Sequence, residues 1–223
     1  MERHFERELE QLQDRIVQMG RLVQRAIQCS VKALWDLDPQ FVMEVIDRIE
    51  PEVNNLHRAI DAHGLELLAL QQPRAGDLRL VTATMRINGD LERIGDRAVH
   101  IAEHAMSMRA YPESVPVIEI QKMAEVAEVM IKDALEAFVR RDESLAREIV
   151  DRDDEVDRYR DLVIIELTAA ATEDRRVVQQ ALDLILVSRN LERIADHATN
   201  IAEAAIFLIF GKDTRHHAEE PQR

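Results

Sequence analysis

The sequence contains almost the same thirteen letters twice, 100 residues apart: LERIGDRAVHIAE at residues 91–103 and LERIADHATNIAE at residues 191–203. Nine of the thirteen positions are identical. Within each copy, apolar residues recur at the three- and four-residue spacing of an α-helix. A helix repeated at this separation indicates two related halves, each long enough to form a small domain. The rest of the chain must supply each copy with partner helices.

Helical spacing and chain breakers divide the sequence into segments. Prolines punctuate the first half, and turns containing Asp mark the second. Glu50 before Pro51 is predicted to cap a helix, and Asp153 is predicted to be the matching N-cap. Segments 39–49 and 143–151 are expected to form the first turns of the helices that follow them. The expected helices span residues 3–36, 39–49, 51–71, 76–110, 116–140, 143–151, 154–171 and 175–210.

The composition favours helices throughout. Of 223 residues, 46% are hydrophobic, 32% are charged and only 4% are aromatic, a balance typical of helical proteins. We therefore expect an all-α fold of two tandem, pseudo-symmetric three-helix bundles with long antiparallel helices. The first bundle would comprise residues 1–112 and the second residues 113–212, followed by a polar tail at 213–223.

Charge and cysteine content exclude several functions. The net charge is −14, from 43 acidic and 29 basic residues, so the surface repels nucleic acid. No stretch approaches the 18 or more apolar residues of a membrane span, and no signal peptide is evident. The single cysteine, Cys29, cannot form an internal disulfide and is expected to be a small buried side chain. These features favour a cytoplasmic protein.

The repeated acids lie on one stripe that flanks the predicted core. With Leu191 at 0°, Glu192 and Asp196 lie at about 100° and 140°, beside the apolar seam. The preceding helix carries a second pair of acids, four residues apart, on a similar flank. Matched by position, the stripes comprise Asp153, Asp157, Glu192 and Asp196 in the second half and Glu50, Asn54, Glu92 and Asp96 in the first.

Two such pairs on neighbouring helices present oxygen ligands to a shared space. Side chains four residues apart on a helix lie about 5–6 Å from each other. Carboxylate oxygens suit Mg²⁺, Mn²⁺ or iron. The alternative is a solvated helix face whose acids are neutralised by surface ion pairs with arginines. The arginines considered for this role are Arg93, Arg97, Arg158 and Arg193. Spacing alone leaves the two interpretations equal.

Other candidate sites have weaker support. His100 and His104 are four residues apart, but the second half has Asn200 and Ala204 there, so both histidines are expected to face solvent. A ferritin-like oxidase would place Glu-x-x-His inside a bundle, and no histidine here has a Glu three residues before it. Phosphate-binding loops and nucleophile motifs are also absent from the sequence.

Five segments together resemble the PhoU family of phosphate-signalling regulators. They are HFERELEQLQDRIVQMG, QQPRAGDLRLV, LERIGDRAVHIAE, SRNLERIADHATNIAE and IFGKDTRH. The resemblance covers nearly the whole chain. It implies two similar three-helix bundles whose acid-x-x-x-Asp pairs bind metal clusters. Carried over by position, one site would use Asp153, Asp157, Glu192 and Asp196, and the other Glu50, Asn54, Glu92 and Asp96. Because Asn54 replaces an acid, the first site is expected to bind cations more weakly.

The resemblance also implies a non-enzymatic role. Family members repress phosphate uptake and the phosphate-starvation response, linking the ATPase of a phosphate ABC transporter to a sensor histidine kinase. The cations implied are Fe, Mn, Mg or Zn, in mononuclear or multinuclear form, and a homodimer is expected. Two alternatives remain: an accessory regulator of another anion transporter, and a metal-dependent phosphohydrolase or oxidase.

Overall fold

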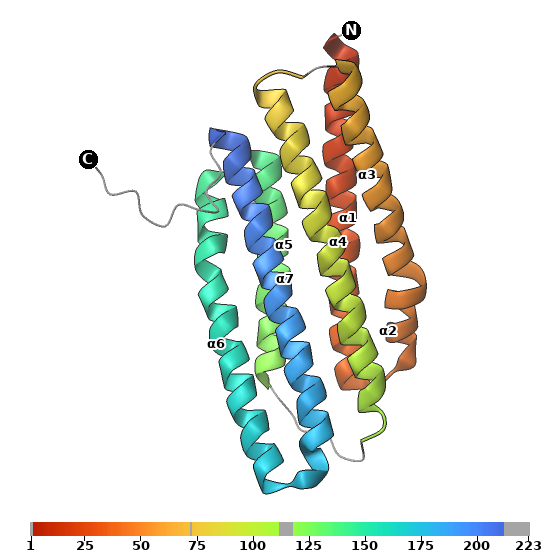
Figure 1. Ribbon diagram of the computed structural model, residues 1–223, viewed down its shortest axis with the longest axis vertical. Coiled ribbons are helices and arrows are strands. Elements are labelled where there is room, and N and C mark those ends of the chain that lie inside the picture. Colours follow the sequence, from red (N-terminus) through yellow and green to blue (C-terminus); the bar gives the residue numbers. More distant parts are fainter. Residues whose placement is uncertain (1, 72, 112–117, 212–223) are drawn as a thin grey trace, which may run out of the picture.

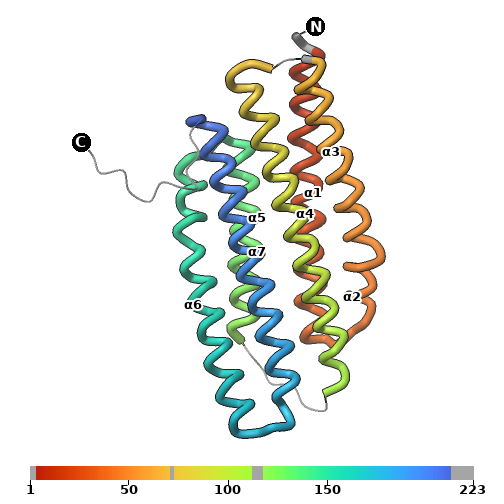
Figure 2. The backbone as a smooth tube through the Cα atoms, viewed as in Figure 1, coloured from red at the N-terminus to blue at the C-terminus, as the bar shows by residue number. Residues whose placement is uncertain are grey.

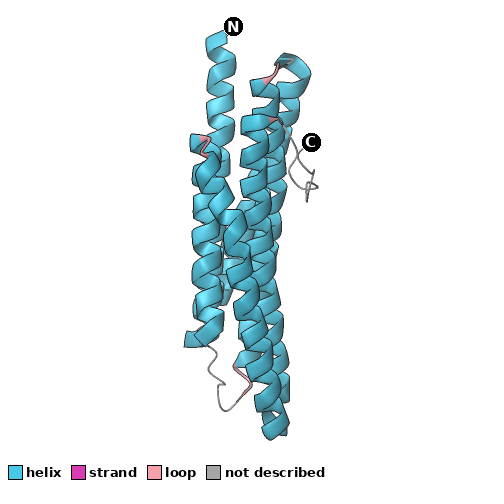
Figure 3. Cartoon of the chain, turned by 90° about the vertical axis from the view of Figure 1, so that its left-hand side faces the viewer, coloured by secondary structure: helices cyan, strands magenta, loops and turns pink. Residues whose placement is uncertain are grey.

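The computed structural model describes residues 2–71, 73–111 and 118–211, and within these ranges the chain is helical apart from short turns. All long helices run nearly parallel to the long axis of the molecule (Figures 1 and 3). In chain order the elements are α1 (Glu2–Asp36), α2 (Pro39–Glu44), the π-helical turn η1 (Val45–Ile49), α3 (Glu50–Gln71), α4 (Gly76–Met108), α5 (Ile118–Arg140), α6 (Glu143–Glu173), the 3₁₀ turn η2 (Arg175–Val177) and α7 (Val178–Phe210).

Local capping residues set several helix boundaries. The Asp38 carboxylate accepts a hydrogen bond from the Gln40 N–H, and α2 begins directly after it with a proline. Asp142 caps α6 in the same way, accepting from the Leu145 N–H at 3.1 Å. At the end of α7, Gly211 adopts φ 71°, the left-handed conformation that glycine permits at a helix C-terminus.

Two predicted helix starts are wrong. Asp153 lies inside the continuous helix α6, and Asp142 is its N-cap instead. Glu50 does not cap a helix either, since its backbone is already helical (φ −58°, ψ −47°). Segments 39–49 and 143–151 are the first turns of longer helical runs, as expected.

The turn η1 accommodates one additional residue in the first half. The Glu50 N–H donates to the carbonyl five residues earlier, so this turn holds one residue more than an α-helical turn. The sequences of the two halves also differ by one residue here. One residue separates Arg48 from Glu50 in the first half, and none separates Arg152 from Asp153 in the second. The π turn therefore carries the helix into Glu50 without a break.

The helices form two three-helix bundles that pack against each other. Helices α1, α3 and α4 contact one another in the first bundle, and α5, α6 and α7 do so in the second. The main contact between bundles joins α4 to α7, which lie side by side in Figures 1 and 2. Both copies of the repeat therefore lie near the centre of the molecule. The fully buried side chains of the two repeats include Leu91, Ile94, Ala98, Ile101, Leu191, Ile194, Ala195 and Ala198. The predicted all-α fold of paired three-helix bundles is confirmed.

Some sequence predictions concern residues outside the described ranges. The boundary between the repeats at 112/113 and the polar tail at 213–223 are among them. Among the described helices, none is long and apolar enough to cross a membrane. Cys29 is buried, as expected.

Candidate metal centre

The second bundle brings four predicted site residues together between α6 and α7. Asp153 and Asp157 are four residues apart on α6, and Glu192 and Asp196 are four apart on α7, a helix that packs along α6. These carboxylates flank the core, because Val156, Leu191 and Ala195 beside them are buried. The acid stripe thus has the position that helical periodicity predicts.

The acids around Asp153 contribute to a shift in its pKa. Burial raises the pKa of Asp153 from an ordinary 3.8 to about 6, and the negative charges of Asp196, Asp157, Asp154 and Glu192 add to the rise. Asp154, an exposed neighbour, is a member of the cluster that the spacing argument missed. Because mutual repulsion opposes ionisation, a cation would stabilise the cluster.

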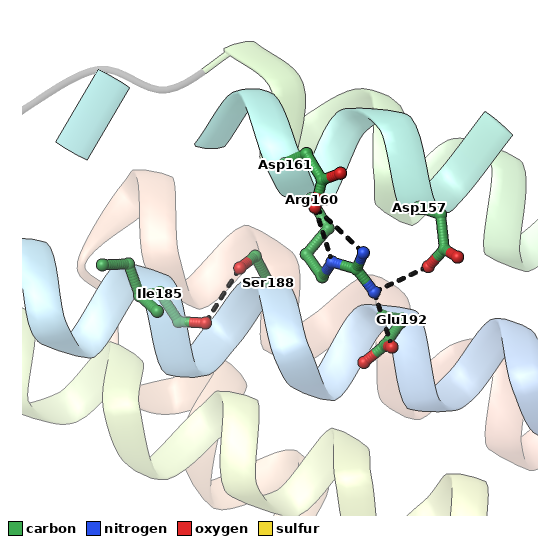
Figure 4. Close-up of polar contacts among 6 residues, drawn as sticks. All are labelled: Asp157, Arg160, Asp161, Ile185, Ser188 and Glu192. Atoms are coloured by element: carbon green, nitrogen blue, oxygen red, sulfur yellow. Dashed lines mark hydrogen bonds and ion pairs between the residues drawn. The ribbon is translucent and has the colours of Figure 1, made fainter. Parts of the chain in front are cut away.

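An arginine lies between the two acid pairs. The Arg160 Nη1 atom donates to Asp157 Oδ1 and to Glu192 Oε1, each at 2.8 Å, so one guanidinium joins α6 to α7 (Figure 4). On its other side the same group donates to Asp161. The cluster therefore accommodates a positive charge between carboxylates of two helices, as a hard cation would require. These ion pairs supply the neutralisation that the alternative interpretation assigned to arginines, although from a different arginine.

Sequence reasoning missed this arginine. Arg158, one of the four residues expected to neutralise the acids, instead lies over the Tyr159 ring, 5.5 Å from its centroid. Arg160 is three residues after Asp157 and therefore on the same helix face. That spacing was a usable signal for an ion pair between Arg160 and Asp157.

The first bundle holds the matching positions differently. Glu50 and Asn54 lie on α3, and Glu92 and Asp96 lie on α4, which packs beside it. The Asn54 side-chain amide donates to Glu50 Oε1. The position that corresponds to Arg160 is His57, so no guanidinium bridges α3 and α4 there. This half therefore offers three carboxylates and an amide oxygen.

Neither half has a finished metal geometry in this conformation. Over residues 2–71, 73–111 and 118–211, no group of three or more His, Cys, Asp or Glu side chains is arranged as a ligand set. In the second half Asp157 and Glu192 accept hydrogen bonds from Arg160 instead.

A second polar cluster joins the bundles and was not predicted. Asp183 on α7 is buried, and its carboxylate accepts from the Tyr111 hydroxyl at 2.6 Å and contacts His104 Nδ1 at 3.1 Å. Burial, with the hydrogen bond and charge of Asp183, raises the pKa of Tyr111 to about 12. The prediction that His104 faces solvent is wrong, whereas His100 is exposed as expected and pairs with Glu103.

The raised pKa of Asp153 predicts a pH dependence of stability. Between pH 3.8 and about 6 the folded protein binds more protons than the unfolded chain, so the free energy of unfolding of metal-free protein falls across this window as pH rises. We expect Asp153→Asn to raise this free energy at about pH 7.5 by roughly 1 kcal/mol, after allowance for solvent screening, and to change it little near pH 4.

Urea unfolding at both pH values measures the effect, with Asp14→Asn on the exposed side of α1 as the control. An equal stabilisation at both pH values would contradict the assignment of the repulsion to an ionised Asp153.

Fold and site together define a class: an all-α protein of two related three-helix bundles, with acid pairs on the helices that flank each core. A family model described as the PhoU domain matches residues 16–105 and 120–205, one match in each bundle. The chain belongs to the PhoU family.

Relatives and solved structures agree with this assignment. The phosphate-specific transport system accessory protein PhoU homolog of Pseudomonas aeruginosa is 37% identical over 95% of this chain and 88% of the relative. The homolog of Aquifex aeolicus is also 37% identical, over 94% of this chain and 95% of the relative.

The crystal structure of PhoU from Pseudomonas aeruginosa matches with a TM-score of 0.89 at 36% identity, over 93% of this chain and 100% of that chain. The phosphate transport system regulatory protein PhoU from Streptococcus pneumoniae matches with a TM-score of 0.86 at 27% identity, over 94% and 99%.

Proposed function

We propose that this chain is a metal-binding accessory protein of a phosphate transport system and that it lowers phosphate uptake and the phosphate-starvation response. The transport role is supported by the family and by relatives named phosphate-specific transport system accessory protein, whose similarity covers 94–95% of this chain. The observation that carries the metal-binding part is the pair of acid stripes that meet between α6 and α7, with a raised pKa at Asp153.

The second-half site would bind one or more hard cations. Its ligands would be Asp153, Asp157, Glu192 and Asp196, and those of the first-half site Glu50, Asn54, Glu92 and Asp96. Oxygen ligands favour Mg²⁺, Mn²⁺ or iron, with Zn²⁺ a further candidate. Bound metal would neutralise the repulsion among the carboxylates and fix α6 against α7. The first site, with one carboxylate fewer, would bind more weakly.

The protein would act by contact with partners in the cytoplasm. The proposed partners are the ATPase of the phosphate ABC transporter and a membrane sensor histidine kinase. A net charge of −14 favours basic partner surfaces. A homodimer is also proposed, and the apolar side chains that α6 and α7 leave exposed are candidates for the contact between the two copies. These side chains are Leu162, Ile165, Val178, Leu182 and Leu186.

A reporter strain tests this function. In a bacterium that lacks its own PhoU protein, a promoter induced by phosphate starvation is active even in ample phosphate if repression depends on the family. We expect the wild-type chain to restore repression several-fold. The Glu192→Gln/Asp196→Asn variant should restore less, and Glu66→Gln/Glu166→Gln, which alters exposed acids elsewhere, should act like wild type.

Expression of soluble wild-type protein without repression would contradict the regulatory role. If Glu192→Gln/Asp196→Asn restores repression as fully as the control Glu66→Gln/Glu166→Gln, the role of metal would be contradicted but the transport role would stand.

A further inference from the structure

A hollow beside the carboxylate cluster is lined by three arginines. It lies between α6 and α7, has a volume of about 280 Å³, and is bordered by Arg160, Ile164, Arg189, Glu192 and Arg193. The lining comes mainly from two pairs spaced four residues apart, one on each helix, so both helices direct side chains into the same space. Three guanidinium groups around one small hollow are unusual in a chain of net charge −14.

One of these guanidinium groups, that of Arg160, is hydrogen-bonded to nearby carboxylates in this structure. Arg160 donates to Asp157 and Glu192 through Nη1 and to Asp161 through Nε and Nη2 (Figure 4). Three positive charges therefore face three negative ones, and the hollow has little net attraction for an anion. Neutralising Asp157 and Glu192 would leave an excess of two positive charges, with the Nη1 donor of Arg160 available.

We propose that this hollow is a binding site for a small tetrahedral oxyanion and that a cation on Asp157 and Glu192 completes it by releasing Arg160. The proposal rests in part on the metal binding proposed above. Guanidinium groups match oxyanions because their planar forks donate paired hydrogen bonds. Cation and anion would then bind with positive coupling, and each would raise the affinity of the other by the same factor.

The first bundle lacks the same residues and provides an internal comparison. Position matching places His57 where the second half has Arg160, Asp61 where it has Ile164, and Gly89 where it has Arg189. Of the three arginines, the first half retains only Arg93, the counterpart of Arg193, and it also keeps the acid as Glu92. One oxyanion site per chain is therefore expected, in the second bundle.

Calorimetric titration of metal-stripped protein with inorganic phosphate tests the anion site without any metal. The variant Asp157→Asn/Glu192→Gln removes the two acids that hold Arg160 Nη1. We expect it to bind phosphate at least about tenfold more tightly than wild type, since a charge-assisted donor becomes available. The control Glu10→Gln/Glu66→Gln removes two exposed charges from α1 and α3 and should bind like wild type.

Two results would overturn the site: phosphate affinity of the Asp157→Asn/Glu192→Gln variant equal to that of the control, or affinity that survives the further change Arg189→Gln/Arg193→Gln. Circular dichroism confirms that each variant stays helical.

A second experiment repeats the phosphate titration of the wild-type protein in the presence of Mn²⁺, at a concentration too low to precipitate manganese phosphate. The affinity for phosphate should rise. If the double variant binds phosphate while wild type ignores Mn²⁺, the oxyanion site stands, and the coupling to metal is refuted.

Discussion

The double variant Glu192→Gln/Asp196→Asn is expected to lose one class of metal site while keeping its helices. Both side chains lie on α7 beside Asp153 and Asp157, and both add negative charge to that cluster. Replacing two carboxylates by amides removes half of the charged ligands. The loss of affinity for Mn²⁺ should reach about 100-fold, at or above the upper end of the 10- to 100-fold cost of losing an outer-shell partner. Calorimetric titration of metal-stripped protein measures it.

The matched control is Glu92→Gln/Asp96→Asn on α4, at the equivalent positions of the first repeat. It should remove the weaker class of site and leave the stronger one intact. Equal affinities of the two classes in wild type would contradict the ranking based on Asn54. Unchanged binding in both variants would show that the acid stripes are solvated surfaces.

The second large effect is expected from Asp183→Ala. Asp183 is buried between the bundles and is bonded to Tyr111 and His104. Its removal leaves the Tyr111 hydroxyl and the His104 ring without their acceptor inside the protein. The free energy of unfolding should fall by roughly 2–4 kcal/mol, the range for a broken buried network. Urea unfolding measures this change.

A spectroscopic readout separates this network from general damage. The Tyr111 hydroxyl has its pKa raised to about 12, partly by Asp183, so the variant should ionise Tyr111 at lower pH in an ultraviolet titration. Glu166→Ala, an exposed change on α6, should alter neither quantity. A loss below about 0.5 kcal/mol for Asp183→Ala would mean that this polar cluster contributes little to the contact between bundles.

In the second half, the Arg160 guanidinium would compete with a cation for the carboxylates. A metal ion bound at the proposed site would have to displace the guanidinium from Asp157 and Glu192 before it could bind both. Part of the advantage of four carboxylates over three is therefore offset by the ion pairs that are lost. In the first half His57, and not an arginine, occupies the matching position.

The core of this fold was predictable because it depends on local periodicity. The apolar positions around Leu91 and Leu191 repeat at helical spacing, and the structure buries them. The acids that flank them followed from the same geometry. The predicted helix start at Asp153 is wrong because Ile149 and Val156, seven residues apart, already continue one helical face across it.

The missed polar contacts depend on how the helices pack. Asp183 and Tyr111 are 72 residues apart in sequence, and no local pattern indicates that they meet. The counterpart of His104 is Ala204, which predicts a solvent-facing side chain, yet the contact of α4 with α7 places His104 beside Asp183. Arg160 makes one contact of each kind. Its spacing from Asp157 is local and visible in the sequence, whereas its hydrogen bond to Glu192 depends on how α6 packs against α7.

The most direct test of the metal centre is anomalous scattering from crystals of the wild-type protein grown with Mn²⁺. We expect a peak between α6 and α7 within bonding distance of Asp157 and Glu192, with the Arg160 guanidinium turned away from both. A fully ordered Arg160 still bonded to both carboxylates, with no anomalous peak beside Asp153 or Asp196, would contradict the assignment of these acids as metal ligands.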